Sequence, residues 1–309
     1  MTAAPSHALI YAKLTGVALV WGGSFIAARV VAVEMPAPTA ALWRYLIATA
    51  ALLVLSFAIE RGLPRLSRAQ AVSVLLLAVT GVVFYSVFYM YGMQTVSASR
   101  GSLIIATLPA ATLLGGALFL HEPLTLRRGA GIAIALFGVA VELGRGNPLA
   151  LLQGHAGIGE AWLFGGVLSW AAYTLLGRRL LKELTPLAAT TYAAIIGTAL
   201  LAMLCAATGD LALPTATLRG WGGLVFLGLF GTALAYIWFY DGVQALGPAR
   251  TSIFVNLVPV AAITFGVLLL GEPLETSMIV GAALVVSGVF IINWPARATA
   301  SAPAAAPLH

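Results

Sequence analysis

The stretch RGSLIIATLPAATLLGGALFLHEPL at residues 100–124 returns in altered form as RTSIFVNLVPVAAITFGVLLLGEPL at residues 250–274. The copies share their first arginine, their central prolines (Pro109 and Pro259) and their closing Glu-Pro-Leu. A constant spacing between such matches is typical of an internal repeat. The chain is therefore interpreted as two copies of one unit.

The repeat extends beyond this stretch, because Gly81 matches Gly231 at the same spacing. The predicted organisation is a first unit at residues 1–147 and a second unit at 148–294. The remaining residues, 295–309, are rich in alanine and proline and are predicted to form a disordered cytoplasmic tail.

The composition places the chain in a lipid bilayer. Hydrophobic residues make up 61% of it and charged residues only 8%, and the mean hydropathy is +1.01. A membrane-spanning helix needs about 20 mostly apolar residues. The segments that meet this requirement are 9–31, 37–59, 69–93, 98–120, 127–144, 158–181, 186–208, 217–240, 248–270 and 275–293. The predicted fold is an all-α polytopic membrane protein with ten transmembrane helices.

Five spans in each unit have a mechanical consequence. After an odd number of crossings, the second unit enters the membrane from the opposite side, so the two five-helix repeats are predicted to be inverted. Inverted repeats are typical of secondary transporters, in which the two halves alternate around a site near the membrane midplane.

Lys and Arg residues set the predicted orientation, since short cytoplasmic loops carry an excess of them. With both termini in the cytoplasm, the basic residues on that side are Lys13, Arg61, Arg65, Arg68, Arg127, Arg128, Arg178, Arg179, Lys182, Arg250 and Arg297. Those on the outer side are Arg29, Arg100, Arg145 and Arg219. The net charge of +6 is thus a feature of membrane topology, and no nucleic-acid partner is expected.

Several short runs resemble a known family. They are Val-Trp-Gly-Gly-Ser-Phe at 20–25, Trp-Arg-Tyr at 43–45, and the elements His-Glu-Pro-Leu and Gly-Glu-Pro-Leu that begin at His121 and Gly271. Together they resemble EamA-type members of the drug/metabolite transporter superfamily, over nearly the whole chain. The resemblance implies ten helices in two repeats and export of small metabolites. The many aromatic residues further resemble the aromatic amino-acid exporters of the YddG type.

Polar and aromatic side chains at membrane depth are the candidates for substrate binding, because such groups face a bundle interior or a cavity. They are Trp21, Ser24, Tyr45, Phe84, Tyr85, Phe88, Tyr89, Trp170, Tyr173, Tyr236, Trp238, Tyr240 and Asn256. Tyr85 and Tyr89 share one face of the third span. Phe84, Phe88 and Tyr91 share another. An aromatic-lined cavity would suit a flat apolar ligand with polar ends. Helix packing and interfacial aromatic belts are the alternatives.

Arg44 is the most unusual charge, since it lies inside the second span, where an unpaired arginine costs about 2.5–3.5 kcal/mol. Glu34 or a backbone carbonyl could pair with it in a structural role. The alternative is that Arg44 holds a substrate carboxylate at the outer mouth.

Four residues are candidates for charge or gating roles: Arg44, Pro109, Pro259 and Asp241. The two prolines occupy matching positions and can kink their helices, and Asn256 could satisfy a carbonyl that such a kink exposes. Asp241 lies near a span end. No acid lies clearly at mid-span, so facilitated exchange or uniport is the alternative to proton coupling.

The sequence lacks the parts of an enzyme. Its histidines, His7, His121, His155 and His309, all fall in predicted loops or tails, and no phosphate-binding loop occurs. No catalytic residue, cofactor or metal is predicted. The expected protein is an inner-membrane exporter of small metabolites that works without ATP. Aromatic or hydrophobic amino acids are the favoured substrates. Its partners are the small-molecule substrate and the bilayer, and it is a monomer or a weak homodimer. The alternatives are an exporter of drugs or nucleotide-type metabolites, or a lipid-carrier flippase subunit.

Overall fold

The computed structural model describes residues 7–153, 157–180, 184–211, 213 and 215–294, so the predicted disordered tail lies outside the described residues. Within the described ranges the regular elements are all helical. The helices are α1 (His7–Glu34), α2 (Ala37–Glu60), α3 (Arg68–Leu77), η1 (Ala78–Phe84), α4 (Tyr85–Thr95), α5 (Ala98–Ile105), α6 (Leu108–Leu120), α7 (Leu126–Leu143), η2 (Pro148–Gln153), α8 (Ile158–Leu180), α9 (Pro186–Thr208), α10 (Leu218–Val225), η3 (Phe226–Leu234), α11 (Ala235–Leu246), α12 (Pro248–Val255), α13 (Leu257–Leu270) and α14 (Thr276–Asn293).

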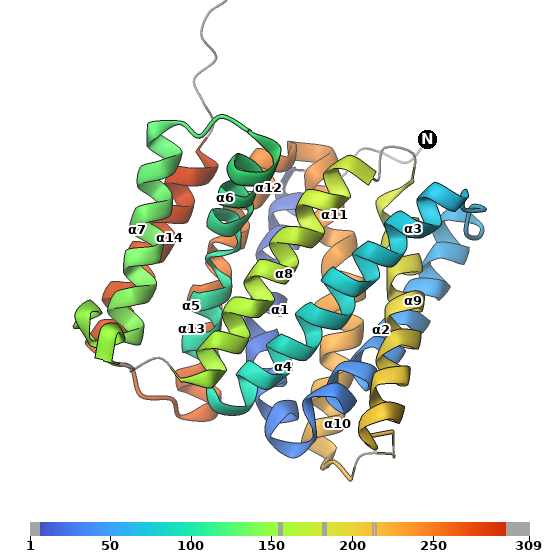
Figure 1. The fold of residues 1–309 in the computed structure, drawn as a ribbon, viewed down its shortest axis with the longest axis horizontal. Helices are drawn as coiled ribbons and strands as arrows, with labels where there is room; N and C mark the ends of the chain where they lie inside the picture. The colour runs from blue at the N-terminus through green and yellow to red at the C-terminus, as the bar shows by residue number, and fades with distance from the viewer. Residues whose placement is uncertain (1–6, 154–156, 181–183, 212, 214, 295–309) are drawn as a thin grey trace, which may run out of the picture.

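These elements join into long helical stretches, and eight of them are long and apolar enough to cross a membrane. The predicted spans α7 and α8 do not meet that composition criterion. In α7 the cause is charge, since Arg127, Arg128 and Glu142 lie within its length. Both helices nevertheless run alongside the others (Figure 1). The all-α polytopic membrane fold is confirmed.

The third span of each half contains a π-helical segment, in which backbone hydrogen bonds span five residues and not four. In the first half η1 lies between α3 and α4, and in the second half η3 lies between α10 and α11. The matched glycines Gly81 and Gly231 fall inside these segments. The sequence repeat is therefore also a repeat of this local irregularity.

The fourth span of each half is broken, as the paired prolines predict. The chain turns at residues 106–107 before α6 and at Asn256 before α13, and Pro109 and Pro259 follow these breaks. In the first break the Thr107 hydroxyl donates to the carbonyl of Ile104 at 2.6 Å. Asn256 was expected to bond to a carbonyl at the second break. That expectation is wrong, because both polar atoms of its buried side chain lack a hydrogen-bond partner.

Two helix pairs occupy opposite edges of the molecule. In Figure 1, α7 and α14 lie side by side at one edge, whereas α2 and α9 lie at the other. Glycines allow the close contact of α7 with α14: a Cβ atom at Gly138 would lie 2.8 Å from the carbonyl oxygen of Gly281. Small residues permit such backbone approach in membranes. The glycines at 138 and 281 thus permit close packing of α7 with α14.

Hydroxyl pairs join α2 to α9. Thr49 and Thr198 are hydrogen-bonded at 2.9 Å, and Ser56 and Thr191 at 2.8 Å. Interhelical hydrogen bonds of this kind contribute about 0.6 kcal/mol each in a membrane. They fix the position of α2, which carries Arg44.

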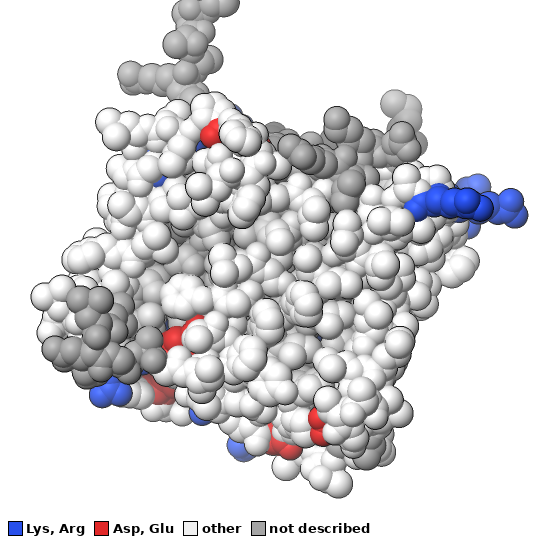
Figure 2. Space-filling view, in the orientation of Figure 1, with Lys and Arg blue, Asp and Glu red and all other residues white. Residues whose placement is uncertain are grey.

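Charged atoms lie mostly near the upper and lower edges of the face shown in Figure 2, and the surface between them is almost free of charge.

Candidate functional site: a buried aromatic cluster around Arg44

Four helices from both halves of the chain bring aromatic side chains together in the interior. We call this group the aromatic cluster; it comprises Tyr45 of α2, Tyr85 and Tyr89 of α4, Trp170 and Tyr173 of α8, and Tyr236 of α11. All six residues were among the predicted candidates.

Ring contacts connect the members of the cluster. Tyr85 and Tyr89 stack with their centroids 5.8 Å apart and an interplanar angle of 7°. The ring centroid of Trp170 lies 4.8 Å from that of Tyr85 and 4.9 Å from that of Tyr173. The hydroxyls of Tyr173 and Tyr236 lie close enough to interact. The cluster thus presents both flat apolar faces and hydroxyl groups.

Arg44 lies beside these rings without a conventional partner. Its Cζ atom is 5.5 Å from the ring centroid of Tyr45 and 6.0 Å from that of Tyr89. Its Nε and Nη1 atoms are buried and make no hydrogen bond. The candidate pairing with Glu34 is wrong, because the Glu34 carboxylate instead accepts hydrogen bonds from the backbone and hydroxyl of Thr217, at 2.9 and 2.8 Å.

The aromatic contacts of Arg44 offset only part of the cost of its charge. Contact with aromatic faces offsets about 0.5–2 kcal/mol of the cost of placing the charge in the membrane, which leaves part of an insertion cost of about 2.5–3.5 kcal/mol. A carboxylate can take two parallel hydrogen bonds from a guanidinium group. The cluster therefore has the chemistry to bind a small molecule with an aromatic or apolar body and a carboxylate.

Trp21 and Ser24, two of the predicted binding residues, lie where α1 packs against the third span of the second half. The indole Nε1 of Trp21 donates to the carbonyl of Gly231 at 3.0 Å, and its ring lies 5.5 Å from that of Phe239. The hydroxyl of Ser24 donates to the carbonyl of Val20 at 2.9 Å. The polar groups of both side chains are thus engaged by backbone.

The other aromatic face of the third span, at the junction of η1 and α4, points away from the cluster, as the spacing predicts. Phe84 is 48% exposed and stacks on Phe88, and Phe88 in turn packs on Trp162 of α8. The structure therefore does not bring Phe84 or Phe88 to Arg44. Their positions favour the packing interpretation.

The remaining aromatic candidates of α11 also lie apart from Arg44. Trp238 packs on α1, where a Cβ atom at Gly16 would lie 2.7 Å from its ring. Tyr240 lies near Glu60, at the end of α2. Both residues fit a role in helix packing.

Asp241 forms an ion pair with Lys13, with 2.5 Å between the carboxylate oxygen and Nζ. This pair joins α1 to α11 near one end of the bundle. Sequence reasoning placed Asp241 near a span end but identified no partner for it. The pair involves one charge from each half of the chain.

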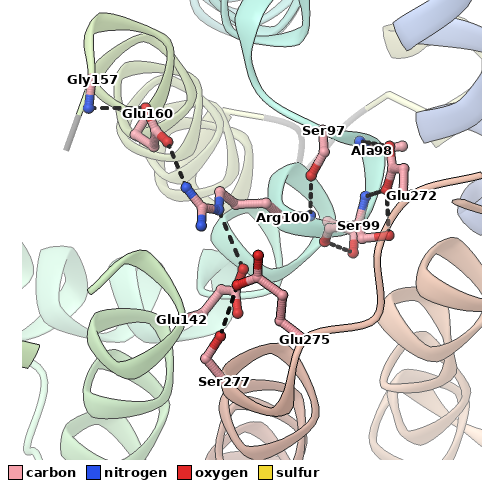
Figure 3. A network of polar contacts seen from close by, with 11 residues as sticks. Ser97, Ala98, Ser99, Arg100, Glu142, Gly157, Glu160, Glu272, Glu275 and Ser277 are labelled. Atoms are coloured by element: carbon pink, nitrogen blue, oxygen red, sulfur yellow. Dashed lines mark hydrogen bonds and ion pairs between the residues drawn. The ribbon is translucent and has the colours of Figure 1, made fainter. Parts of the chain in front are cut away.

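A second charged group at the other end of the bundle was not recognised from sequence as a unit. Arg100 of α5 lies between two carboxylates, with Nε 3.2 Å from Glu142 of α7 and Nη1 3.3 Å from Glu160 of α8 (Figure 3). The signal that could have found it is the conservation of arginine between the two copies of the repeat, at positions 100 and 250.

Glu272 lies next to this group and caps α5. Its carboxylate accepts hydrogen bonds from the backbone of Ala98 at 2.7 Å and from the backbone and hydroxyl of Ser99 at 2.9 and 2.5 Å. A carboxylate at a helix N-terminus satisfies otherwise unpaired N–H groups and interacts favourably with the helix dipole. Glu272 thus has a structural role at the start of α5. Within the described ranges, no group of His, Cys, Asp and Glu side chains is arranged to hold a metal ion.

Comparison with known proteins agrees with this architecture. The sequence profile of the EamA-like transporter family matches residues 9–143 and 157–294, which together make up most of the chain. The chain belongs to the EamA-like transporter family. It is accordingly a multi-pass membrane transporter of the drug/metabolite type rather than an enzyme, and its substrate is a small molecule.

Two relatives of this EamA-like transporter cover most of its length. It is 30% identical over 286 residues to the uncharacterized transporter YyaM of Bacillus subtilis, covering 92% of this chain and 93% of that protein. It is also 30% identical over 275 residues to a probable terminal-alkyne amino-acid exporter of Streptantibioticus cattleyicolor, and this match covers 88% of this chain and 89% of that protein. One crystal structure, 19% identical, aligns with a TM-score of 0.63 over 93% of this chain and 98% of its own, a likeness of fold.

Proposed function

We propose that this transporter exports amino acids with aromatic or hydrophobic side chains, and that the aromatic cluster binds them. The observation that carries the proposal is Arg44, a buried guanidinium whose Nε and Nη1 atoms lack partners beside the rings of Tyr45 and Tyr89. The substrate carboxylate would bind Arg44, and its side chain would lie against the cluster.

The proposed cycle is alternating access between inverted repeats. Both termini would lie in the cytoplasm of a cell whose inner membrane holds the protein. In this arrangement the Lys13–Asp241 pair lies near the cytoplasmic end and the Arg100 group near the outer end. Each group contains charges from both halves, so breaking and remaking them would accompany opposite movements of the halves. No step requires ATP.

Two considerations favour amino acids over the alternatives. The relative from Streptantibioticus cattleyicolor bears the name of an amino-acid exporter. Among the described residues, Arg44 is the cation near the rings of the cluster. A nucleotide-type metabolite with several phosphate charges would call for more cations than this, whereas a single carboxylate matches one guanidinium group.

The direct test is uptake by liposomes that contain the purified full-length protein. Radiolabelled Phe and Trp would be compared with Thr, Glu and a nucleoside, each with and without an imposed pH gradient. Saturable uptake of Phe or Trp without the gradient establishes a facilitative amino-acid carrier. Uptake that needs the gradient establishes coupling, and uptake of the nucleoside alone rejects the proposal.

Competition experiments isolate the role of Arg44. Unlabelled 3-phenylpropionate keeps the carboxylate of Phe, whereas phenethylamine lacks it, so the first should compete with Phe uptake more strongly. Replacement of Arg44 by Gln should lower Phe uptake by about tenfold or more, the equivalent of one hydrogen bond to a charged group. Arg65→Gln, in an exposed loop, is the control. Equal competition by both compounds would reject carboxylate binding at Arg44.

A further inference from the structure

An apolar groove runs along the outside of α1. Its floor is α1 from Leu19 to Ala27, and its walls are α10 and η3 on one side and α13 on the other. Its volume is about 480 Å³. Leu19 and Leu269 at its rim are 48% and 68% exposed, so the groove opens toward the surrounding lipid.

A second hollow, of about 420 Å³, continues this groove at the end of α1. Its polar lining residues are Arg29 of α1, Thr95 and Ser97 at the turn between α4 and α5, and Glu272 after α13. Ile26 of the groove and Val30 of the second hollow lie four residues apart on one face of α1, and Leu269 and Leu270 are consecutive in α13, so the two adjoin.

The depth of each hollow in the membrane follows from helix geometry. Arg29 lies little more than one turn from the end of α1 at Glu34, and the other polar lining residues lie at or beyond helix ends on the same side. Arginine at this depth reaches the level of lipid headgroups. The apolar groove extends from there toward the middle of the hydrocarbon layer.

The second hollow offers both a positive and a negative group. Arg29 uses Nη1 to donate to the carbonyl of Met93 at 2.6 Å, and its delocalised charge remains in the hollow. The hydroxyl of Ser97 accepts a hydrogen bond from the backbone of Arg100, which leaves its proton to donate. Glu272 accepts three hydrogen bonds, fewer than its two oxygens can take.

We propose that the groove and the hollow together bind one phosphatidylethanolamine molecule. Its phosphate would lie by Arg29 and the Ser97 hydroxyl, its ammonium group by Glu272, and one acyl chain in the groove on α1. The adjacent opposite charges match a zwitterionic headgroup whose ammonium can donate hydrogen bonds. A choline headgroup cannot donate them, and a glycerol headgroup lacks the positive charge.

The lipid is a resident ligand and not the transported molecule. The groove lining from Leu19 to Ala27 and along α10, η3 and α13 consists of apolar side chains and glycines. A headgroup crossing the membrane by this route would lose all its polar contacts, which costs several kcal/mol. The groove therefore holds an acyl chain and blocks the headgroup.

The experiment is native mass spectrometry of the full-length protein in detergent, with phosphatidylethanolamine, phosphatidylcholine and phosphatidylglycerol of identical acyl chains. We expect one phosphatidylethanolamine to be retained about tenfold more than the others, the equivalent of one charge-assisted hydrogen bond. Arg29→Gln and Gly222→Leu should each reduce retention by a similar factor. Gly222 lines the groove and a Cβ atom there meets nothing within 4 Å, so a leucine side chain starts in open space and should occupy the groove.

Matched controls exist at distant positions. Arg127, like Arg29, donates to a backbone carbonyl, that of Trp294 at 2.6 Å, and Gly129 has the same open space as Gly222. Arg127→Gln and Gly129→Leu should therefore leave retention unchanged. If Arg29→Gln fails to fold, Gly222→Leu decides alone.

Three results would overturn the proposal. Equal retention of all three lipids, unaffected by the variants, would indicate only the general lipid coat. Loss of binding in Arg29→Gln with no effect of Gly222→Leu would indicate a soluble zwitterion in the hollow. Movement of labelled phosphatidylethanolamine across liposomes by the wild type, abolished in Gly222→Leu, would make the lipid a cargo.

Discussion

The ring of Tyr173 in α8 packs against Gly81 in η1, so closely that a Cβ atom at position 81 would overlap it. This contact joins the first helix of the second half to the third span of the first half. The equivalent contact of the repeat is present too, since a Cβ atom at Gly231 would lie 2.8 Å from the Ser24 hydroxyl. A glycine in each π-helical segment thus receives a side chain from the other half.

Gly81→Ala should move Tyr173 and disturb its contacts with Trp170 and Tyr236. Overpacking of this kind costs about 1–3 kcal/mol, so thermal unfolding in detergent should begin at a lower temperature and Phe uptake should fall. Gly129→Ala is the control because its Cβ atom would meet nothing within 4 Å. Equal unfolding temperatures for both variants would show that the Tyr173 ring moves aside freely.

Trp21 and Trp170 occupy matching positions of the repeat but should respond differently to phenylalanine. Trp21→Phe removes the hydrogen bond to Gly231, which should lower the free energy of unfolding by about 1 kcal/mol. Trp170→Phe reduces a ring that contacts Tyr85 and Tyr173, so it should weaken the apparent affinity for Phe. Denaturation and uptake measured on both variants distinguish these effects. The reverse pattern would place the substrate near Trp21.

Tyr85→Ala should impair transport while leaving the amount of folded protein largely unchanged. The change removes the ring that stacks on Tyr89 and contacts Trp170. Phe88→Ala provides a comparison on the other face of α4, where the ring packs on Trp162. Uptake should be normalised to the monodisperse protein recovered. Loss of folded protein in Tyr85→Ala would favour a packing role for the cluster.

Arg100→Ala should destabilise the fold by about 3–5 kcal/mol, because it leaves the buried carboxylate of Glu142 unpaired. Glu142→Gln should cost less, since its amide oxygen can still accept a hydrogen bond from Arg100. A double-mutant cycle with both changes would measure the coupling. If the effects of the two single changes simply add, the contact contributes little to stability.

Gly138→Val should separate α7 from α14. The new side chain would meet the backbone of Gly281 and Val285, which cannot move aside as a flexible side chain can. We expect a lower unfolding temperature and faster proteolysis near this edge, with a smaller effect on the affinity for Phe because the aromatic cluster is distant. Gly129→Val, on the same helix with open space, controls for valine in α7.

The sequence predicts the spans and their breaks well, because these depend on local properties. Hydrophobic length identifies the helices, and the prolines at 109 and 259 mark the breaks before α6 and α13. The separation of Tyr85 and Tyr89 from Phe84 also follows from helical spacing alone. No packing information is needed for any of these features.

Side-chain partners could not be predicted in the same way. Glu34 is close to Arg44 in sequence, yet it bonds to Thr217, because the rotation of each helix about its axis is set by its neighbours. The unpaired state of Asn256 likewise depends on which side of the break faces the interior. Hydropathy identifies a helix and its length but leaves this rotation open.

The cap on α5 has a consequence for how the chain is made. The first half enters the membrane before the second half has been synthesised. Glu272 belongs to the connection before the last helix, so the N–H groups of Ala98 and Ser99 lack their carboxylate until most of the chain has left the ribosome. If synthesis stalls before this point, helix α5 of the first half has no carboxylate cap. Quality-control proteases would then act on a first half whose fourth span begins with unpaired N–H groups.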